Sequence, residues 1–283
     1  MTNFYLKDVA STVANALAED LGEGDVTAAL IDLAQQARAT VITRQEATIA
    51  GAPWVNEVFQ QVDPSIDIKW KVIEGQRALQ DTVLFELTGP AASILTAERT
   101  ALNFLQTLSA TATAAHHYAS LVEGSKTQIL DTRKTLPGLR LAQKYAVQIG
   151  GGSNHRIGLF DAFLIKENHI VAAGGIAEAI SRARTMSPSL RLEIEVESLD
   201  ELSEAIAAKP DWIMLDNFDN ESLRRAVAMT PPSIKLEVSG GIENDDDIKR
   251  IAALGVDYIS IGAMTKHIQA TDLSLRMITT PSD

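Results

Sequence analysis

The pattern of apolar and polar positions predicts a parallel sheet covered by helices in the second part of the chain. From Gln128 onward, short apolar runs alternate with segments whose apolar residues recur at helical spacing. Strands are predicted at 128–130, 162–165, 192–196, 212–215, 235–238 and 258–261, with helices at 139–148, 175–186, 199–208, 220–229 and 245–254. Such alternation is typical of α/β folds. No glycine-rich dinucleotide motif follows the first strand, which favours a barrel, complete or short of eight strands, over a Rossmann sheet.

The first 110 residues or so have a different pattern. A helix is predicted at 6–19, and strand-like runs at 39–43, 66–72 and 83–87 are separated by glycine and proline. We expect a small α+β domain with an antiparallel sheet. A long helix follows at 93–121, capped by Ser93 or Thr96, and Ser109 is a candidate position for a break in it.

Composition narrows the class of protein. The net charge of -12 argues against a general nucleic-acid or anionic-membrane surface, and no apolar run has membrane-spanning length. There is no cysteine, which excludes disulfides, thiolate metal sites and cysteine nucleophiles. The N-terminal segment lacks the features of a signal peptide, so we expect a cytoplasmic protein.

A basic segment stands out in this acidic chain. Between Lys126 and Ile170 there are three acidic residues and seven basic ones: Lys126, Arg133, Lys134, Arg140, Lys144, Arg156 and Lys166. Lys134 and Lys166 directly follow predicted buried strands, which favours an anionic ligand over a solvated basic face. Arg140 and Lys144, four residues apart on the next helix, are expected to be surface or secondary contacts.

Every predicted strand of the second part ends in charged residues or glycine. The segments that follow the six strands are Asp131–Lys134, Lys166–His169, Glu195–Glu197, Asp216–Asn217, Ser239–Gly241 and Gly262–Ala263. In parallel barrels the carboxyl ends of the strands form the active site. Six such ends in register predict an active site there, without identifying its reaction.

The last two strand ends carry glycines. Gly240, Gly241 and Gly262 would let backbone N–H groups approach a phosphate, and their place after the last two strands favours this interpretation over glycines that only make tight turns. Glu193 and Glu195 share one face of their strand, and inward carboxylates need a cation. Lys134 or Lys166 could supply that cation; Glu195 and Asp216 could instead hold Mg²⁺ or sugar hydroxyls, or belong to a structural ion-pair network.

Several motifs together resemble one enzyme family. The segments ERTALN (98–103), DTRKTLPGLR (131–140), NHR (154–156), LIKENH (164–169), EIEVES (193–198), LDN (215–217) and VSGGI (238–242) occur in the order and spacing of the quinolinate phosphoribosyltransferases. The resemblance covers nearly the whole chain, including the loop EDLGEGDVT (19–27), and we find no departure at the motif positions.

The resemblance implies an α/β fold of two domains. An N-terminal α/β sandwich would occupy residues 1–110, and an incomplete barrel of about seven strands would occupy 111–267, with the tail 268–283 packing back on the first domain. The seventh strand would lie around 108–127 or near the barrel closure. It further implies a homodimer or larger homo-oligomer, in which Arg99 reaches the partner's site, and no nucleic-acid or membrane partner.

Roles for the site residues follow from the same resemblance. Arg99, Arg133, His155 and Arg156 would bind the two carboxylates of quinolinate. Four catalytic residues would surround phosphoribosyl pyrophosphate and Mg²⁺: Lys134, Lys166, Glu195 and Asp216. Glu195 and Asp216 would also bind the metal, and Lys166 would also bind substrate. Its 5′-phosphate would be bound by Ser239, Gly240, Gly241 and Gly262.

The reaction implied is phosphoribosyl transfer to the ring nitrogen of quinolinate, giving nicotinate mononucleotide, pyrophosphate and CO₂ for NAD biosynthesis. No covalent enzyme intermediate is required, and the chain carries no nucleophile motif of the common kinds. Two alternatives remain. One is a related phosphoribosyltransferase for another ring carboxylate such as nicotinate, and the other is a non-catalytic barrel that binds a phosphate ligand.

Overall fold

The computed structural model describes residues 2–32 and 34–279, which form two compact units. The first unit comprises the described residues of 1–116, 135–151 and 263–283, and the barrel unit comprises 117–134 and 152–262. The chain was expected to divide near residue 110, with everything up to 267 in one barrel domain. By its contacts, however, the segment 135–151 groups with the first unit.

A four-stranded antiparallel sheet forms the centre of the first unit. Its strand order is β12 (Leu273–Thr279), β1 (Gln36–Thr43), β5 (Val83–Pro90) and β3 (Asp67–Trp70). Along β1 every second residue is buried, as expected for a strand with one face on a core. The C-terminal tail supplies β12, which pairs with β1 along its length; residues 280–283 of that tail lie outside the described residues.

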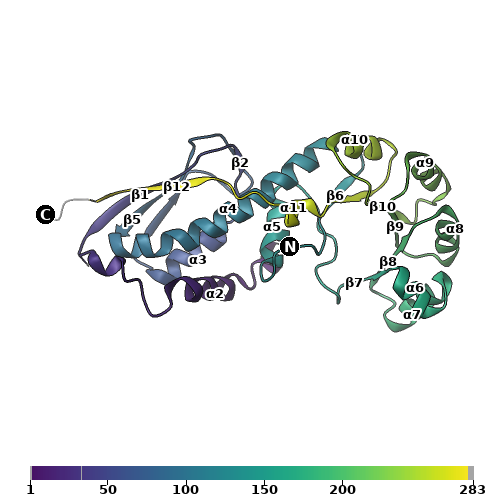
Figure 1. Cartoon of the computed structure of the whole chain (residues 1–283), viewed down its shortest axis with the longest axis horizontal. Coiled ribbons are helices and arrows are strands. Elements are labelled where there is room, and N and C mark those ends of the chain that lie inside the picture. Colours follow the sequence, from purple (N-terminus) through teal and green to yellow (C-terminus); the bar gives the residue numbers. More distant parts are fainter. Residues whose placement is uncertain (1, 33, 280–283) are drawn as a thin grey trace. The chain divides into compact units, whose positions relative to one another are not determined.

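Helices complete the first unit, and Figure 1 shows α3 and α4 beside its sheet. Fully buried aromatic side chains fill the space between them, including Trp54, Phe59 and Phe85. The helices are α1 (Thr2–Tyr5), α2 (Val9–Leu21), the 3-10 turn Ala28–Leu30, α3 (Ala52–Val62), most of α4 (Ala91–Leu121), α5 (Arg140–Ile149) and α11 (Ala263–Lys266), and a small sheet pairs β2 (Ala47–Thr48) with β4 (Arg77–Ala78).

The long helix α4 differs from its prediction at two points. It starts at Ala91, so neither Ser93 nor Thr96 is its cap, and the Thr96 hydroxyl donates to Asp25 Oδ2 at 2.9 Å instead. It is also unbroken at Ser109, whose hydroxyl bonds the backbone N–H and carbonyl of Ala50. A polar residue that favoured a break by its sequence therefore has its partners in a neighbouring segment.

Helix α5 also differs from expectation. Lys144 was predicted to be a surface or secondary contact, but it is fully buried, so the surface alternative is wrong. Arg140 is partly buried, and its Nε donates to Thr135 Oγ1 at 3.1 Å. The sequence spacing of Arg140 and Lys144 could not reveal this, because burial of α5 depends on the packing around the whole helix.

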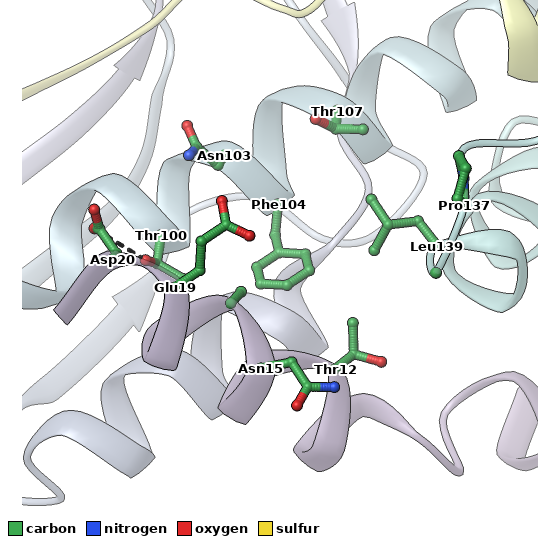
Figure 2. Close-up of a pocket in the computed structure, with 12 residues that line it drawn as sticks. Thr12, Asn15, Glu19, Asp20, Thr100, Asn103, Phe104, Thr107, Pro137 and Leu139 are labelled. Atoms are coloured by element: carbon green, nitrogen blue, oxygen red, sulfur yellow. Dashed lines mark hydrogen bonds between the residues drawn. The ribbon is translucent and has the colours of Figure 1, made fainter. Parts of the chain in front are cut away.

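A cavity of about 480 Å³, here called the first-unit cavity, lies between α2, α4 and the segment 137–139. Figure 2 shows the Phe104 ring from α4 directed toward α2, with Glu19 and Asp20 at one end. The Thr100 hydroxyl donates to Asp20 Oδ2 at 3.4 Å. None of the described residues that line this cavity is a lysine or an arginine.

The barrel unit contains the predicted parallel sheet of six strands. The order is β6 (Gln128–Leu130), β11 (Tyr258–Ser260), β10 (Lys235–Ser239), β9 (Trp212–Asp216), β8 (Arg191–Val196) and β7 (Ala162–Ile165). Figure 1 shows the helices as an arc outside these strands. They are α6 (Glu167–Ala173), α7 (Ile176–Met186), α8 (Leu199–Ala208), α9 (Asn220–Met229) and α10 (Asp245–Ala253). The α/β prediction is confirmed.

A seventh strand does not form around 108–127, because residues 108–121 belong to α4. Beyond the six strands, the described residues of the barrel unit add one isolated parallel bridge, between Leu130 and Ser153. It lies on the free side of β6, at the end of the sheet, and the sheet is open between β6 and β7. None of the described helices combines the length and hydropathy needed to cross a bilayer.

Candidate active site

A second cavity of about 480 Å³, the barrel cavity, opens at the carboxyl ends of the parallel strands. It brings together most of the residues predicted from the strand ends. The lining residues are Thr132, Arg133, Lys134, His155, Arg156, Leu164, Lys166, Glu195, Met214, Asp216, Glu237, Ser239 and Ser260. Four of them are basic, and three are acidic.

The two-residue period of the strands explains why these side chains meet. Successive strand residues point to opposite sides of the sheet, so every second residue faces the barrel interior. On β9 these are Met214 and Asp216, and on β10 they are Glu237 and Ser239. The intervening residues Leu215 and Val238 are buried and apolar, as expected for positions under the outer helices.

Arg133 and Arg156 form an electropositive pair in the barrel cavity. Burial and the neighbouring charge of Arg133 lower the pKa of Arg156. The buried Nε of Arg133 has no hydrogen-bond acceptor among the described residues. Two adjacent guanidinium groups, one with an unused buried donor, are arranged to receive an anion, and their planar shape suits carboxylates.

The carboxylates lie with the two lysines at the strand ends. Lys166 Nζ is 2.5 Å from Glu195 Oε2, as predicted from their neighbouring strands. Burial and the charge of Glu195 raise the pKa of Asp216, whereas the charges of Lys166 and Lys134 oppose that rise. Asp216 and Glu195 are therefore close enough to repel each other, and a cation between them would relieve that repulsion.

The predicted glycines lie next to these groups. A Cβ on Gly240 would come within 2.2 Å of Asn217 Oδ1 and 3.0 Å of Asp216 Oδ1. A Cβ on Gly262 would come within 3.1 Å of Lys134 Cδ. Gly240 and Gly241 both have positive φ, of 76° and 64°. Glycine at 240 and 262 thus permits a close approach to two site residues, and the strand end also presents Ser239 to the cavity.

His155 is buried and enters a cluster of two buried carboxylates. Its Nε2 lies 2.8 Å from Glu193 Oε2 and 3.2 Å from Glu237 Oε2, at ion-pair distance but without good hydrogen-bond direction. On its other side, Nδ1 accepts the backbone N–H of Arg156 at 2.7 Å. Burial opposes a charge on the imidazole, but the two carboxylates outweigh it and raise the pKa of His155 to about 9.

These observations disagree about the protons of His155. A pKa near 9 would place a proton on both ring nitrogens at neutral pH, whereas the contact from Arg156 requires an unprotonated Nδ1. Burial and the charge of Glu237 raise the pKa of Glu193, so the extra proton can lie on that carboxyl. We therefore assign a proton to Nε2 and leave Nδ1 as an acceptor, because the Nδ1 contact is short.

Arg99 is not among the residues that line the barrel cavity. It lies on α4 in the first unit, with its side chain 61% exposed and a loose contact of 3.9 Å from Nη2 to Glu98 Oε1. An exposed arginine with so weak a contact within its own unit is available to another molecule.

The sequence analysis assigned no role to Glu237, Ser260 or Thr132, which also line the barrel cavity. A usable signal was present for Glu237. It lies two residues before Ser239 on the same strand, so both side chains point to the same face of the sheet. The same two-residue spacing places Glu193 and Glu195 on one face of their strand. Glu193 itself was recognised as inward, but its contact with His155 depends on the folded position of the NHR segment.

Comparisons with known proteins agree over most of the chain. Residues 25–109 match the N-terminal domain model of quinolinate phosphoribosyl transferase, and residues 111–276 match its C-terminal domain model. A probable carboxylating nicotinate-nucleotide pyrophosphorylase from Bacillus subtilis is 40% identical, over 91% of this chain and 89% of that protein. The carboxylating enzyme of Mycobacterium leprae is 38% identical, over 93% and 95%.

Solved structures show the same similarity. The nicotinate-nucleotide pyrophosphorylase of Francisella tularensis superposes with a TM-score of 0.93 and is 50% identical, with 96% of this chain and 97% of that chain covered.

Proposed function

The chain belongs to the quinolinate phosphoribosyl transferase family, and we propose that it transfers phosphoribose from phosphoribosyl pyrophosphate to quinolinate. The products would be nicotinate mononucleotide, pyrophosphate and CO₂, a reaction of NAD biosynthesis. The observation that carries this proposal is the barrel cavity, where four basic side chains meet Glu195 and Asp216 at the carboxyl ends of the strands. A substrate with two carboxylates and a co-substrate rich in phosphate both suit such a lining.

Arg133 and Arg156 bind the two carboxylates of quinolinate in this proposal. Support comes from the buried Arg133 Nε, which has no acceptor among the described residues, and from the neighbouring Arg156. Arg99 of a second copy of the chain would complete the pocket, which requires a homodimer or a larger homo-oligomer. Its exposure on α4 is consistent with such a role. A cytoplasmic location stays a prediction.

Phosphoribosyl pyrophosphate would occupy the side of the cavity that carries the lysines. Lys134 and Lys166 offset the charge of the pyrophosphate, and Ser239, Gly240, Gly241 and Gly262 surround the 5′-phosphate. The donors present also fit Mg²⁺, because Glu195 and Asp216 offer oxygen ligands that repel each other without a cation. When bound, Mg²⁺ would neutralise part of the pyrophosphate charge.

The reaction begins with attack of the pyridine nitrogen on C1 of the ribose. The C1–O bond to pyrophosphate breaks with its electron pair, through a transition state that resembles an oxocarbenium ion. The carboxylates of Glu195 and Asp216 stabilise the positive charge that develops on the sugar. Both lysines stabilise the departing pyrophosphate.

Decarboxylation follows from the charge on the alkylated ring. The cationic ring nitrogen accepts the electron pair released when the adjacent C–C bond breaks and CO₂ leaves, and that carbon then takes up a proton. The second carboxylate stays bound by its arginines, which keeps the ring in place. No protein nucleophile is needed at any step.

The proposal is tested by incubating the purified chain with phosphoribosyl pyrophosphate and either quinolinate or nicotinate. We expect equal amounts of CO₂ and nicotinate mononucleotide from quinolinate, at a rate far above that of any product from nicotinate. A preference for nicotinate would assign the chain a different ring carboxylate. Binding of phosphoribosyl pyrophosphate without turnover of either acid would instead indicate a non-catalytic barrel.

A further inference from the structure

Three basic residues of the barrel cavity share a feature of their backbone. The N–H of Lys134 donates to Thr132 Oγ1 at 3.1 Å, and that of Arg156 donates to His155 Nδ1 at 2.7 Å. The N–H of Lys166 donates to His169 Nδ1 at 3.0 Å. In each case a nearby side chain fixes the peptide from which a cationic side chain extends into the cavity.

The segment that carries Arg156 is fixed most completely. Its backbone has no helix or strand hydrogen bonds, yet four consecutive N–H groups from 155 to 158 donate to side chains. Asp131 Oδ1 accepts from His155, the His155 ring accepts from Arg156, and the two oxygens of Asp161 accept from Ile157 and Gly158. Such a network restricts the backbone at the residue that must hold an anion.

The His155 ring is itself attached to the barrel wall. Its exposed fraction is 6%, and Glu193 on β8 and Glu237 on β10 are both fully buried. The ring also meets Trp212 of β9 edge to face, at 6.2 Å between centroids. Three adjacent strands therefore surround the imidazole, which links the irregular segment 154–158 to the most regular part of the unit.

On these contacts, we infer that His155, Glu193 and Glu237 are positioning residues for Arg156. The two buried carboxylates lie 2.8 and 3.2 Å from Nε2 and confine the imidazole between β8 and β10. Nδ1 accepts the N–H of Arg156, so that His155 acts on the substrate through Arg156. This inference rests on the proposed function for its kinetic consequences. It assigns roles to Glu193 and Glu237, which carry none in the reaction described above.

A metal ion is the alternative occupant of this cluster, since one nitrogen and the carboxylate oxygens lie within 4.8 Å of one another. A metal would need the lone pair of Nε2. With Nδ1 accepting the N–H of Arg156, the ring proton must be on Nε2, where it blocks coordination. The contact of Nδ1 with the Arg156 N–H thus favours a cluster with a proton on His155 Nε2 over a cluster that binds a metal ion.

Two substitutions at His155 separate positioning from direct binding. In His155→Asn the side-chain oxygen takes the place of Nδ1 and still accepts the Arg156 N–H, whereas His155→Leu removes the acceptor at similar volume. We expect the KM for quinolinate to rise about threefold in the asparagine variant and about thirtyfold in the leucine variant, with kcat falling less than KM rises. His267→Asn, on an exposed histidine of the first unit, is the matched control and should change neither constant.

Equal losses in the two variants would overturn the inference, because they would show that the imidazole itself contacts the substrate. In Glu193→Gln and Glu237→Gln, which keep an oxygen that can accept from Nε2–H, we expect increases in KM smaller than that of the leucine variant. A stoichiometric metal in the purified wild type, lost in Glu193→Gln, would overturn the inference in favour of the metal site.

A readout without turnover keeps this inference separate from the proposed function. In ¹⁵N NMR of the histidine-labelled wild type, with His155 assigned from the asparagine variant, Nδ1 should have the shift of an unprotonated ring nitrogen and Nε2 that of a protonated one. A proton on Nδ1 would contradict the positioning role, even in an active enzyme. If the wild type instead fails to turn over quinolinate, the proposed function fails while the NMR result still decides the contacts of His155.

Discussion

The two cavities of this protein have the same volume, about 480 Å³ each, and opposite character. The first-unit cavity is lined by hydroxyls, amides, two acids and apolar side chains, with no basic side chain among its described lining residues. The barrel cavity is lined by four basic and three acidic side chains from neighbouring strand ends and loops. Volume therefore does not distinguish an active site, whereas the convergence of several partly buried charges of both signs on one space does.

The secondary-structure elements around each cavity explain why their linings differ in charge. The first-unit cavity lies beside two helices, and Asn15, Glu19, Asp20 and Asn103 in its lining are exposed. In the barrel, parallel strands bring every second side chain to one interior, so that charges converge in a partly buried space. This convergence disfavours the charged form of two residues. Burial and the like charge of Glu195 raise the pKa of Asp216, and burial and the like charge of Arg133 lower the pKa of Arg156.

The largest effect is expected from Arg133→Ala. Removing a guanidinium that binds a substrate carboxylate should lower kcat/KM for quinolinate about a thousandfold, because the loss of a charge-assisted hydrogen bond in a desolvated site costs several kcal/mol. Steady-state kinetics provide the measurement. Asn15→Ala, in the first-unit cavity, should change kcat/KM less than about twofold; similar losses in both would end the distinction between the cavities.

A smaller but still large loss is expected when the carboxylates lose their cation or their charge. Chelation of divalent metal should abolish turnover, and added Mg²⁺ should restore it without a change in the melting temperature. Asp216→Asn should lower kcat about a hundredfold, as is typical when a group that stabilises transition-state charge is removed. Full activity in a metal-free sample would show that Glu195 and Asp216 hold no ion.

The pair Gly240→Ala and Gly241→Ala tests the close approach at the strand end. Both positions have positive φ, so both variants should lose about 1 kcal/mol of unfolding free energy. Only at 240 does the new Cβ meet Asn217 and Asp216, whereas the Cβ at 241 has no neighbour within 4 Å. We expect the KM for phosphoribosyl pyrophosphate to rise about tenfold in the first variant and little in the second. Equal effects would mean that strain alone matters.

The smallest effect on activity is expected from a change in the first unit. Glu74 accepts the N–H groups of Gly51 and Ala52, at 2.9 and 2.6 Å, and the hydroxyl of Tyr145 at 3.0 Å. Glu74→Leu leaves these donors unsatisfied and should cost about 3 kcal/mol of unfolding free energy, with kcat/KM per folded molecule unchanged. Glu204→Ala, at an exposed position on α8, is the control.

The same variant has a pH signature. Burial raises the pKa of Glu74 above its value in the unfolded chain. A carboxyl with a raised folded-state pKa contributes stability below its unfolded pKa and loses it as the pH rises through the folded one. Wild-type stability should therefore fall over that range relative to Glu74→Leu, as followed by denaturant unfolding at several pH values. Parallel curves for the two proteins would exclude this contribution.

The sequence predicted correctly those features that depend on a local pattern of apolar and polar residues. The boundaries predicted for 128–130 and 162–165 agree with β6 and β7, because short buried strands have a distinct pattern. Lys134, Lys166 and Asp216 were selected because they end such strands, and the barrel cavity contains all three. Polar residues at strand ends thus indicated the site before its geometry was known.

Other features depend on contacts between distant segments, which pattern cannot supply. The hydroxyl of Ser109 meets Ala50, so α4 continues where a break was expected. Lys144 is buried by the packing of α5. The contact of His155 with Glu193 joins residues 38 positions apart (193 − 155) on different elements. Each of these follows from tertiary packing, which overrides local preference.

The most direct test of the central claim is a crystal structure of this protein with quinolinate bound. The carboxylates of quinolinate should accept hydrogen bonds from Arg133 Nε and from the guanidinium of Arg156, within the barrel cavity. Quinolinate in the first-unit cavity, or in the barrel cavity without a contact to Arg133, would contradict the assignment of the acid-binding site.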